Sequence, residues 1–365
     1  MVSGRLAPEL VPRTMLSLAH LGGAPVWRHE MDALAEQALQ HVGMLSSLRA
    51  VNDVGRALRL TRHKGDERLL NALDARGGAL LEEIMQHGTL YSNGPAHAAK
   101  IIGLAASIAS NIVYAGVLPR QLLARLLACT TSDDLRAQLA VDVRFVRAAS
   151  MLGVCAHRVL GWAGEEQHAF VTAVMGIIRE SMSGTEAERT LCDQITGREV
   201  PKQRFREDLD GRLGRIRVRE DERRAWDDRD LASIHPFLLS YCNEDDPLLE
   251  RSIEAKRRIS RRHTISVFQK QVYDVLCARL GYTCAMEGDV RGVSVDILVE
   301  HRGVAVECNG NSHYYRNADG MVPCSQLKTM LVEEGGLWRL LNVDQRDWDA
   351  IEGREEAAAW LREKI

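Results

Sequence analysis

The hydrophobic pattern of this 365-residue chain changes its period near Ser266, and this change constrains the fold more than any other feature. Before that point, apolar residues recur three and four positions apart, as in Leu69, Leu70 and Leu73, which is typical of amphipathic helices. After it, apolar and polar residues alternate, which is typical of half-buried strands. The sequence therefore predicts a mostly helical region followed by a small α/β domain.

The composition agrees with a folded, helix-rich protein. Hydrophobic residues make up 45% of the chain and aromatic residues only 5%, which favours helices over an all-β fold. The 47 Lys and Arg residues balance 50 Asp and Glu residues, and this near-neutral charge excludes a polycationic coat for nucleic acid. The eight cysteines form no CxxC pair, so we expect free thiols rather than structural zinc. No apolar run is long enough to predict a membrane span.

Residues 1–198 are predicted to form an α-helical repeat region. Four similar phrases, which begin at Leu16, Ala57, Ile112 and Ala149, each contain the end of an apolar helix, a short break and a new helix. Helix-pair repeats have periods of roughly 34–47 residues, and stacked neighbours bury their apolar faces together. The unequal spacing of the phrases leaves an irregular helical bundle as the alternative. Residues 1–29 are compatible with an organellar transit peptide or with an ordinary first helix.

Residues 199–265 are predicted to form a charged helical connector. Its first half mixes many acidic and basic residues, and its second half contains the basic run 251–263, "RSIEAKRRISRRH", with a single acid, Glu254. This run is either a solvated helix face or a patch that contacts phosphates. The candidate phosphate contacts are Lys256, Arg257, Arg258, Arg261 and Arg262.

Residues 266–365 are predicted to form a separate domain with the element order αβββαβα. A helix over 266–281 precedes a short strand over 283–288 and a hairpin over 293–310 that turns at Gly303. A helix over 325–336, a buried strand over 337–343 and one final helix over 347–365 complete the order. This order, with Asp296 and Glu307 in the two arms of the hairpin, resembles the core of the PD-(D/E)XK nuclease superfamily.

The nuclease resemblance implies a specific chemistry. Two neighbouring carboxylates, Asp296 and Glu307, are able to share a Mg²⁺ ion with a scissile phosphate. The superfamily usually has a lysine two residues after the glutamate, but this chain has Asn309, which cannot transfer a proton. Lys328 on the following helix is a candidate substitute, and His313 is a candidate proton carrier. We therefore expect a nuclease-like but inactive domain, with Mg²⁺ bound only if it is active and no cofactor otherwise.

A closer resemblance is to the RAP domain, over about residues 290–365. The matching positions are Glu307, Gly310, His313, Lys328, Gly336 and Trp348. Two positions differ from the family pattern, since Asn309 replaces the usual Asp and Leu337 replaces an aromatic residue that Trp338 supplies one place later. The resemblance implies RNA binding, with Asn309, His313, Tyr314 and Lys328 as candidate contacts beside the basic run.

RAP domains usually follow helical repeats, as in the FAST kinase-like and octotricopeptide-repeat proteins, which act on organellar RNA. The resemblance therefore implies an RNA-binding protein of the mitochondrial matrix, as a component or assembly factor of the mitochondrial ribosome. Its expected partners are RNA and proteins of the ribosome or another ribonucleoprotein, without a membrane. The alternative is a Mg²⁺-dependent endoribonuclease or a transcript-specific processing or stability factor. Residues 266–365 hold 11 basic and 16 acidic residues, which makes the basic run the more credible RNA contact.

Overall fold

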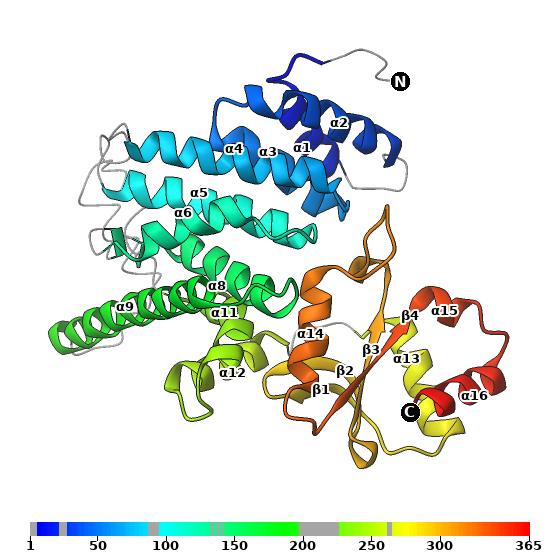
Figure 1. The fold of residues 1–365 in the computed structure, drawn as a ribbon. Coiled ribbons are helices and arrows are strands. Elements are labelled where there is room, and N and C mark those ends of the chain that lie inside the picture. The colour runs from blue at the N-terminus through cyan, green and yellow to red at the C-terminus, as the bar shows by residue number, and fades with distance from the viewer. Residues whose placement is uncertain are drawn as a thin grey trace, which may run out of the picture.

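The computed structural model describes residues 6–21, 28–86, 95–132, 135–136, 139–140, 142–196, 226–260 and 265–365. It confirms the predicted fold class, because a mostly helical region precedes a small domain with a four-stranded mixed sheet (Figure 1). None of the described helices is both long and apolar enough to cross a membrane.

In the described part of the chain, the N-terminal helices form five pairs that stack in two layers (Figure 1). The first helices of the pairs contact one another in chain order, and they are α1 (Val11–His20), α3 (Leu48–Thr61), α5 (Pro95–Tyr114), α8 (Val143–Arg158) and α11 (Asp228–Tyr241). The second helices are α2 (Arg28–His41, followed by the 3₁₀ turn η2, Val42–Met44), α4 (Glu67–Gln86), α6 (Arg120–Thr130), α9 (Glu165–Thr196) and α12 (Pro247–Ser260). Four of these pairs lie within residues 1–198, where helical repeats were predicted, and each of the four similar phrases covers the end of a first helix. The fifth pair, α11 and α12, lies in the segment predicted as a connector.

Local signals explain several of these helix boundaries. The Ser47 hydroxyl accepts a hydrogen bond from the Ala50 amide at the start of α3, and the Asp142 carboxylate caps α8 in the same way. Helix α11 begins with a capping box between Asp227 and Asp230. At the end of α3, Arg62 adopts a left-handed conformation with φ +52°, which turns the chain toward α4.

The second half of the charged segment 199–265 packs into the helical stack. Helix α11 contacts α8 and α12, and its Phe237 side chain is fully buried. Helix α12 also contacts strand β2 (Val293–Val299) of the C-terminal domain. Residues 199–225 and the basic-run residues Arg261 and Arg262 lie outside the described residues.

The C-terminal domain follows the predicted order with one difference. Its elements are α13 (Val267–Asp274, which continues as the π-helical turn η3, Val275–Arg279), β1 (Ala285–Val290), β2, the 3₁₀ turn η4 (Glu300–Arg302), β3 (Val304–Asn309), the 3₁₀ turn η5 (Asn311–His313), α14 (Pro323–Glu333), β4 (Arg339–Asp344), α15 (Gln345–Asp349) and α16 (Arg354–Lys364). The strands lie in the order β1-β2-β3-β4, and only the β3–β4 pair is parallel. The single final helix expected from the sequence is wrong, because Gly353 (φ +91°) separates α15 from α16.

The two faces of this sheet pack against different cores. On one face, Ile297, Val306 and Leu341 join side chains of α13, η3, α15 and α16. On the other face, Ala305 and Leu340 belong to the same hydrophobic core as the stacked N-terminal helices. Helix α14 lies on this second face and contacts α5, α8 and α11. The helical stack and the C-terminal domain therefore share one continuous core through α14.

His235 on α11 is buried beneath the β1–β2 hairpin. Its Nδ1 atom lies 2.9 Å from the Ser252 hydroxyl, and a Cβ atom on Gly292 (φ +81°) would approach its ring to 2.8 Å. Burial, with a smaller contribution from Lys256, lowers the pKa of His235 to about 4. The hairpin therefore sits on a histidine that is neutral in the folded protein.

This histidine predicts a specific loss of stability in acid. Between pH 6.5 and about 4, the unfolded chain binds a proton on His235 that the folded chain does not, so stability falls as the pH falls. We expect His235 to account for a loss of about 2 kcal/mol between pH 7.5 and 5. Urea denaturation of the wild type and of His235→Asn at both pH values measures this difference. The same pH dependence in both proteins would contradict the assignment.

Candidate functional site

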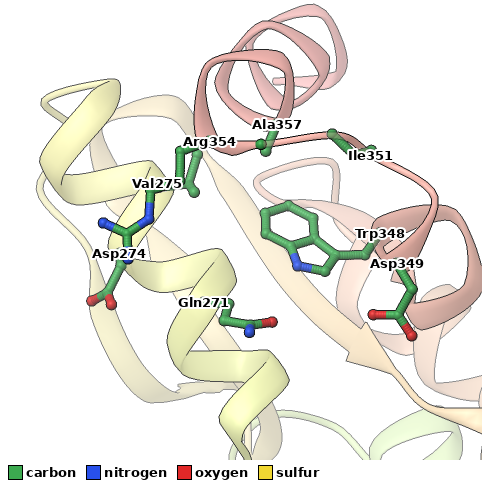
Figure 2. Close-up of a pocket in the computed structure, with 9 residues that line it drawn as sticks. Gln271, Asp274, Val275, Trp348, Asp349, Ile351, Arg354 and Ala357 are labelled. Carbon is green, nitrogen blue, oxygen red and sulfur yellow. The ribbon is translucent and has the colours of Figure 1, made fainter.

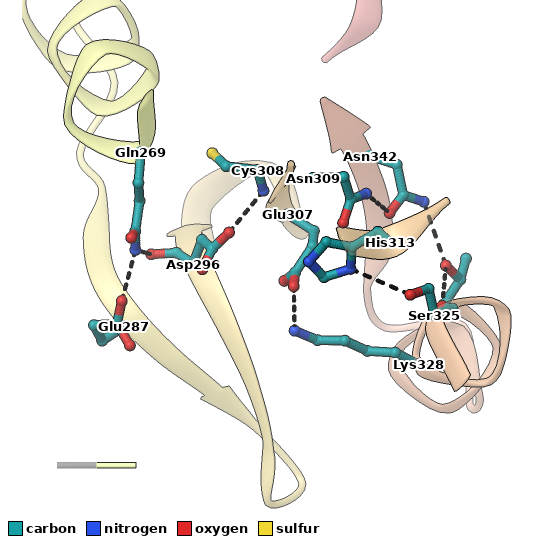
Figure 3. A network of polar contacts seen from close by, with 11 residues as sticks. Gln269, Glu287, Asp296, Glu307, Cys308, Asn309, His313, Ser325, Lys328 and Asn342 are labelled. Carbon is teal, nitrogen blue, oxygen red and sulfur yellow. Dashed lines mark hydrogen bonds and ion pairs between the residues drawn. The ribbon is translucent and has the colours of Figure 1, made fainter. Parts of the chain in front are cut away.

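Glu307 on β3 forms an ion pair with Lys328 on α14 (Figure 3). The Lys328 Nζ atom lies 2.5 Å from the Glu307 Oε1 atom, and the two side chains are only 26% and 7% exposed. The second oxygen, Oε2, is buried and accepts no hydrogen bond from any described residue. Lys328 thus balances the charge of a carboxylate that would be costly to bury alone.

Asp296 on β2 lies next to Glu307, as the sequence predicted. Ile297 pairs with Val306 in the antiparallel β2–β3 register, which places Asp296 and Glu307 on neighbouring positions of the α14 face. Asp296 Oδ2 accepts a hydrogen bond from the Cys308 amide at 2.7 Å. Burial, followed by the negative charge of Glu307, raises the pKa of Asp296 to about 6. The two carboxylates therefore influence each other electrostatically.

Asn309, at the position of the nuclease lysine, ties the strands together. Its side chain is fully buried, and its Nδ2 atom donates a hydrogen bond to Asn342 Oδ1 on β4 at 2.8 Å. The Asn342 amide in turn donates to the Thr329 hydroxyl on α14 at 3.3 Å. This network holds β3, β4 and α14 together, and its geometry gives Asn309 a structural role.

His313 also points into this network. Its Nδ1 atom lies 3.2 Å from the Ser325 hydroxyl on α14. Burial lowers the pKa of His313, and the positive charges of Lys328 and Arg62 lower it further. The imidazole is therefore neutral near pH 7, which suits a hydrogen-bonding role better than contact with phosphate through charge.

The two tyrosines after His313 have different surroundings. The Arg346 guanidinium lies 4.8 Å from the centre of the Tyr314 ring and covers one of its faces. Burial, with the nearby carboxylate of Asp344, raises the pKa of the Tyr314 hydroxyl to about 12. Tyr315 is 8% exposed and donates a hydrogen bond to the Tyr114 carbonyl of α5 at 2.8 Å. Of the two tyrosines, Tyr314 is partly exposed and Tyr315 is buried.

Two further polar residues at this site were not predicted from the sequence. Gln269 on α13 is buried and donates hydrogen bonds to Glu287 Oε1 at 2.6 Å and to the Asp296 carbonyl at 3.2 Å (Figure 3). Glu287 has a left-handed backbone, with φ +52°, and its charge contributes to the raised pKa of Asp296. Gln269 completes a Ser-x-x-Gln capping box with Ser266, so its sequence signal indicates only a helix start.

The described part of the basic run divides into two kinds of residue. Lys256 is half-buried, and burial together with the nearby charge of Lys328 lowers its pKa. Arg257 forms a surface ion pair with Asp289 at 3.2 Å, and Arg258 forms one with Asp228 at 2.9 Å. The fold therefore brings Lys256 to the Glu307–Lys328 pair and engages the two arginines with carboxylates.

The predicted magnesium ligands do not fit a metal site well. Mg²⁺ favours near-octahedral oxygen ligands, and at Glu307 the Lys328 ammonium already occupies the place of a cation. The described residues contain no cluster of three or more His, Cys, Asp or Glu side chains that would hold a metal ion. The geometry instead suits a charged carboxylate that is paired with a lysine.

A cavity of about 300 Å³ lies on the opposite face of the sheet (Figure 2). It is bounded by α13, α15 and α16, and the Trp348 indole forms one wall opposite Gln271. Asp274, Asp349 and Arg354 line its rim. None of the predicted site residues lines this cavity.

Comparison with known proteins found matches for the C-terminal domain. Residues 306–364 match the family model of the RAP domain. The RAP domain-containing protein, chloroplastic, of Oryza sativa subsp. japonica is 29% identical over 106 residues, which cover 29% of this chain. The aligned part spans only 16% of that relative. The end of this chain, from β3 to α16, is therefore a RAP domain.

Proposed function

We propose that this chain binds RNA within an organellar ribonucleoprotein. The RAP domain at residues 306–364 carries this proposal, because domains of this family are generally RNA-binding. The stacked helix pairs supply an extended surface of the kind that repeat proteins use for binding. The relative from Oryza sativa is named as chloroplastic, which supports an organellar location.

The finer assignment is a component or assembly factor of the mitochondrial ribosome, located in the matrix. It rests first on the layout of helical repeats followed by a RAP domain. The modest net charge of the chain, −3, also suits a protein at the periphery of a ribosome better than one buried within ribosomal RNA. Ultraviolet crosslinking of the full chain in isolated mitochondria, with sequencing of the attached RNA, tests it. We expect ribosomal RNA. A few messenger transcripts would favour a processing or stability factor, and no crosslinked RNA would contradict the proposal.

A Mg²⁺-dependent endoribonuclease is the second candidate. Asp296 and Glu307 favour it, because they lie side by side and Glu307 Oε2 has no partner among the described residues. Two other observations favour RNA binding without RNA cleavage: Lys328 forms an ion pair with Glu307, and Asn309 has a structural role.

We therefore expect no Mg²⁺-dependent cleavage by the purified full chain. The assay compares the wild type with Glu307→Gln on the RNA recovered by crosslinking, with and without Mg²⁺. Equal background cleavage in both proteins is the expected result, because no metal-bound water is expected at this carboxylate. Cleavage by the wild type that disappears in Glu307→Gln would establish the nuclease instead.

A further inference from the structure

We propose that the junction between the helical stack and the RAP domain binds the phosphate backbone of RNA. The junction surface consists of Arg59, Arg62 and Lys64, at the end of α3 and in the turn to α4, together with Arg316 from the loop between η5 and α14. This inference rests on the proposed RNA binding and states where the RNA lies. None of these four residues belongs to the basic run.

Hydrogen bonds fix the two sides of the junction against each other. The Arg316 amide donates to the Arg62 carbonyl at 3.0 Å, and the Arg62 guanidinium donates to the Asn311 carbonyl at 2.6 Å. The Asn317 side chain accepts from the Lys64 amide at 2.7 Å and donates to the Lys64 carbonyl at 2.9 Å. These bonds bring cationic side chains from two distant parts of the sequence to one place.

Two cations of the junction surface form cation–π contacts with tyrosine rings. Tyr315 donates its hydroxyl hydrogen to the Tyr114 carbonyl, so the two tyrosines span the junction. The Arg59 guanidinium lies 5.3 Å from the centre of the Tyr114 ring, and the Lys64 ammonium lies 6.0 Å from that of Tyr315. Such contacts position a cation and leave its charge unneutralised.

Among the described residues, the positive charges of the junction surface have no acidic partners. In the part of the chain that the structure describes, none of Arg59, Arg62, Lys64 and Arg316 forms an ion pair with a carboxylate. The nearest acid in sequence to Lys64, Asp66, pairs with Arg68. Like charges held side by side are unfavourable until a polyanion binds them.

The chemistry of this surface identifies its ligand. Burial and the positive charge of Arg62 lower the pKa of Arg316, so the two guanidinium groups act on each other. After burial and the charge of Lys328, the positive charge of Arg62 also lowers the pKa of His313, so Arg62 lies close enough to act on the RAP domain. Cations spread over several segments suit a chain of phosphates better than one small anion. RNA crossing from the helical stack to the RAP domain satisfies this geometry.

Substitution of three exposed cations tests the proposal without removing the junction bonds. The triple variant Arg59→Gln, Lys64→Gln and Arg316→Gln removes three charges. The junction hydrogen bonds of Lys64 and Arg316 use backbone atoms, which remain in the variant. The control, Arg125→Gln, Arg179→Gln and Arg279→Gln, removes the same charge from exposed arginines that are paired with acids. Circular dichroism and thermal melting verify the fold of each protein. The single variant Arg316→Gln removes only one charge and serves as a less disruptive test.

Binding of a fluorescent oligouridine by the full-length proteins is measured over a range of salt concentrations. The measured quantity is the slope of the logarithm of the binding constant against the logarithm of the salt concentration. If three phosphate contacts are lost, this slope becomes shallower by about 2 in the triple variant, whereas the control keeps the wild-type slope. Arg316→Gln alone should flatten the slope by about 0.7. If the wild type binds and the triple variant keeps its slope, or if the control loses as much, the junction surface is wrong but RNA binding stands. If the wild type does not bind the oligouridine, both the proposed RNA binding and the proposed junction surface fail.

Discussion

Lys328→Met is expected to lower the free energy of unfolding by about 3 kcal/mol, because it leaves the Glu307 carboxylate buried without its cation. Glu307 is 7% exposed, and its Oε2 atom accepts no hydrogen bond from the described residues, so no described protein group compensates for the lost ammonium. The partial exposure of Lys328 places the effect at the lower end of the range for buried pairs. Urea denaturation followed by circular dichroism measures it.

Two controls separate the buried charge from the loss of a side chain. The double variant Glu307→Gln and Lys328→Met should recover most of the stability, because it removes both charges. Arg257→Met breaks an exposed ion pair with Asp289 and should cost less than about 1 kcal/mol. A Lys328→Met protein as stable as the Arg257→Met protein would show that the Glu307–Lys328 pair does not hold the domain together.

Trp348→Ala is expected to destabilise the RAP domain by about 3–5 kcal/mol. The Trp348 side chain packs against Phe268, with ring centres 6.1 Å apart, and it walls the cavity on this face of the sheet (Figure 2). Its removal would enlarge a space that the short helices α15 and α16 cannot readily fill. The loss should appear as a lower urea midpoint for the C-terminal domain.

Trp360→Ala provides the matched control for this effect. Trp360 lies on α16 at the edge of the same core, and the Lys364 ammonium lies 5.8 Å from its ring centre. Because this ring is only partly buried, its removal should cost about 1–2 kcal/mol. Equal losses from the two substitutions would contradict the central position of Trp348.

Local periodicity made much of the fold predictable. The helical spacing of the first half and the alternation over Val293–Val299 identify their elements, because burial on one face leaves a direct trace in the sequence. The same alternation places Asp296 and Glu307 on neighbouring strands. The break in the final helix was missed because "DAIEG" offers good helix formers before Gly353, whose φ of +91° ends the pattern.

Contacts between distant segments left no such trace. Arg62 and Arg316 lie far apart in the sequence, and only the folded chain brings their backbones within hydrogen-bonding distance. Lys328 was a candidate for catalysis or RNA contact, but a sequence cannot reveal which carboxylate a lysine on a later helix meets. The position of Glu287 was hidden for a related reason, since half of the residues of its strand β1 are exposed and the strand has no regular apolar face.

Sedimentation of the native chain from isolated mitochondria, before and after ribonuclease treatment, tests RNA-dependent assembly most directly. We expect the chain to co-migrate with a ribosomal subunit in moderate salt and to move to lighter fractions once the RNA is digested. A chain that sediments as a free protein of its own 40.7 kDa, without bound RNA, would contradict it.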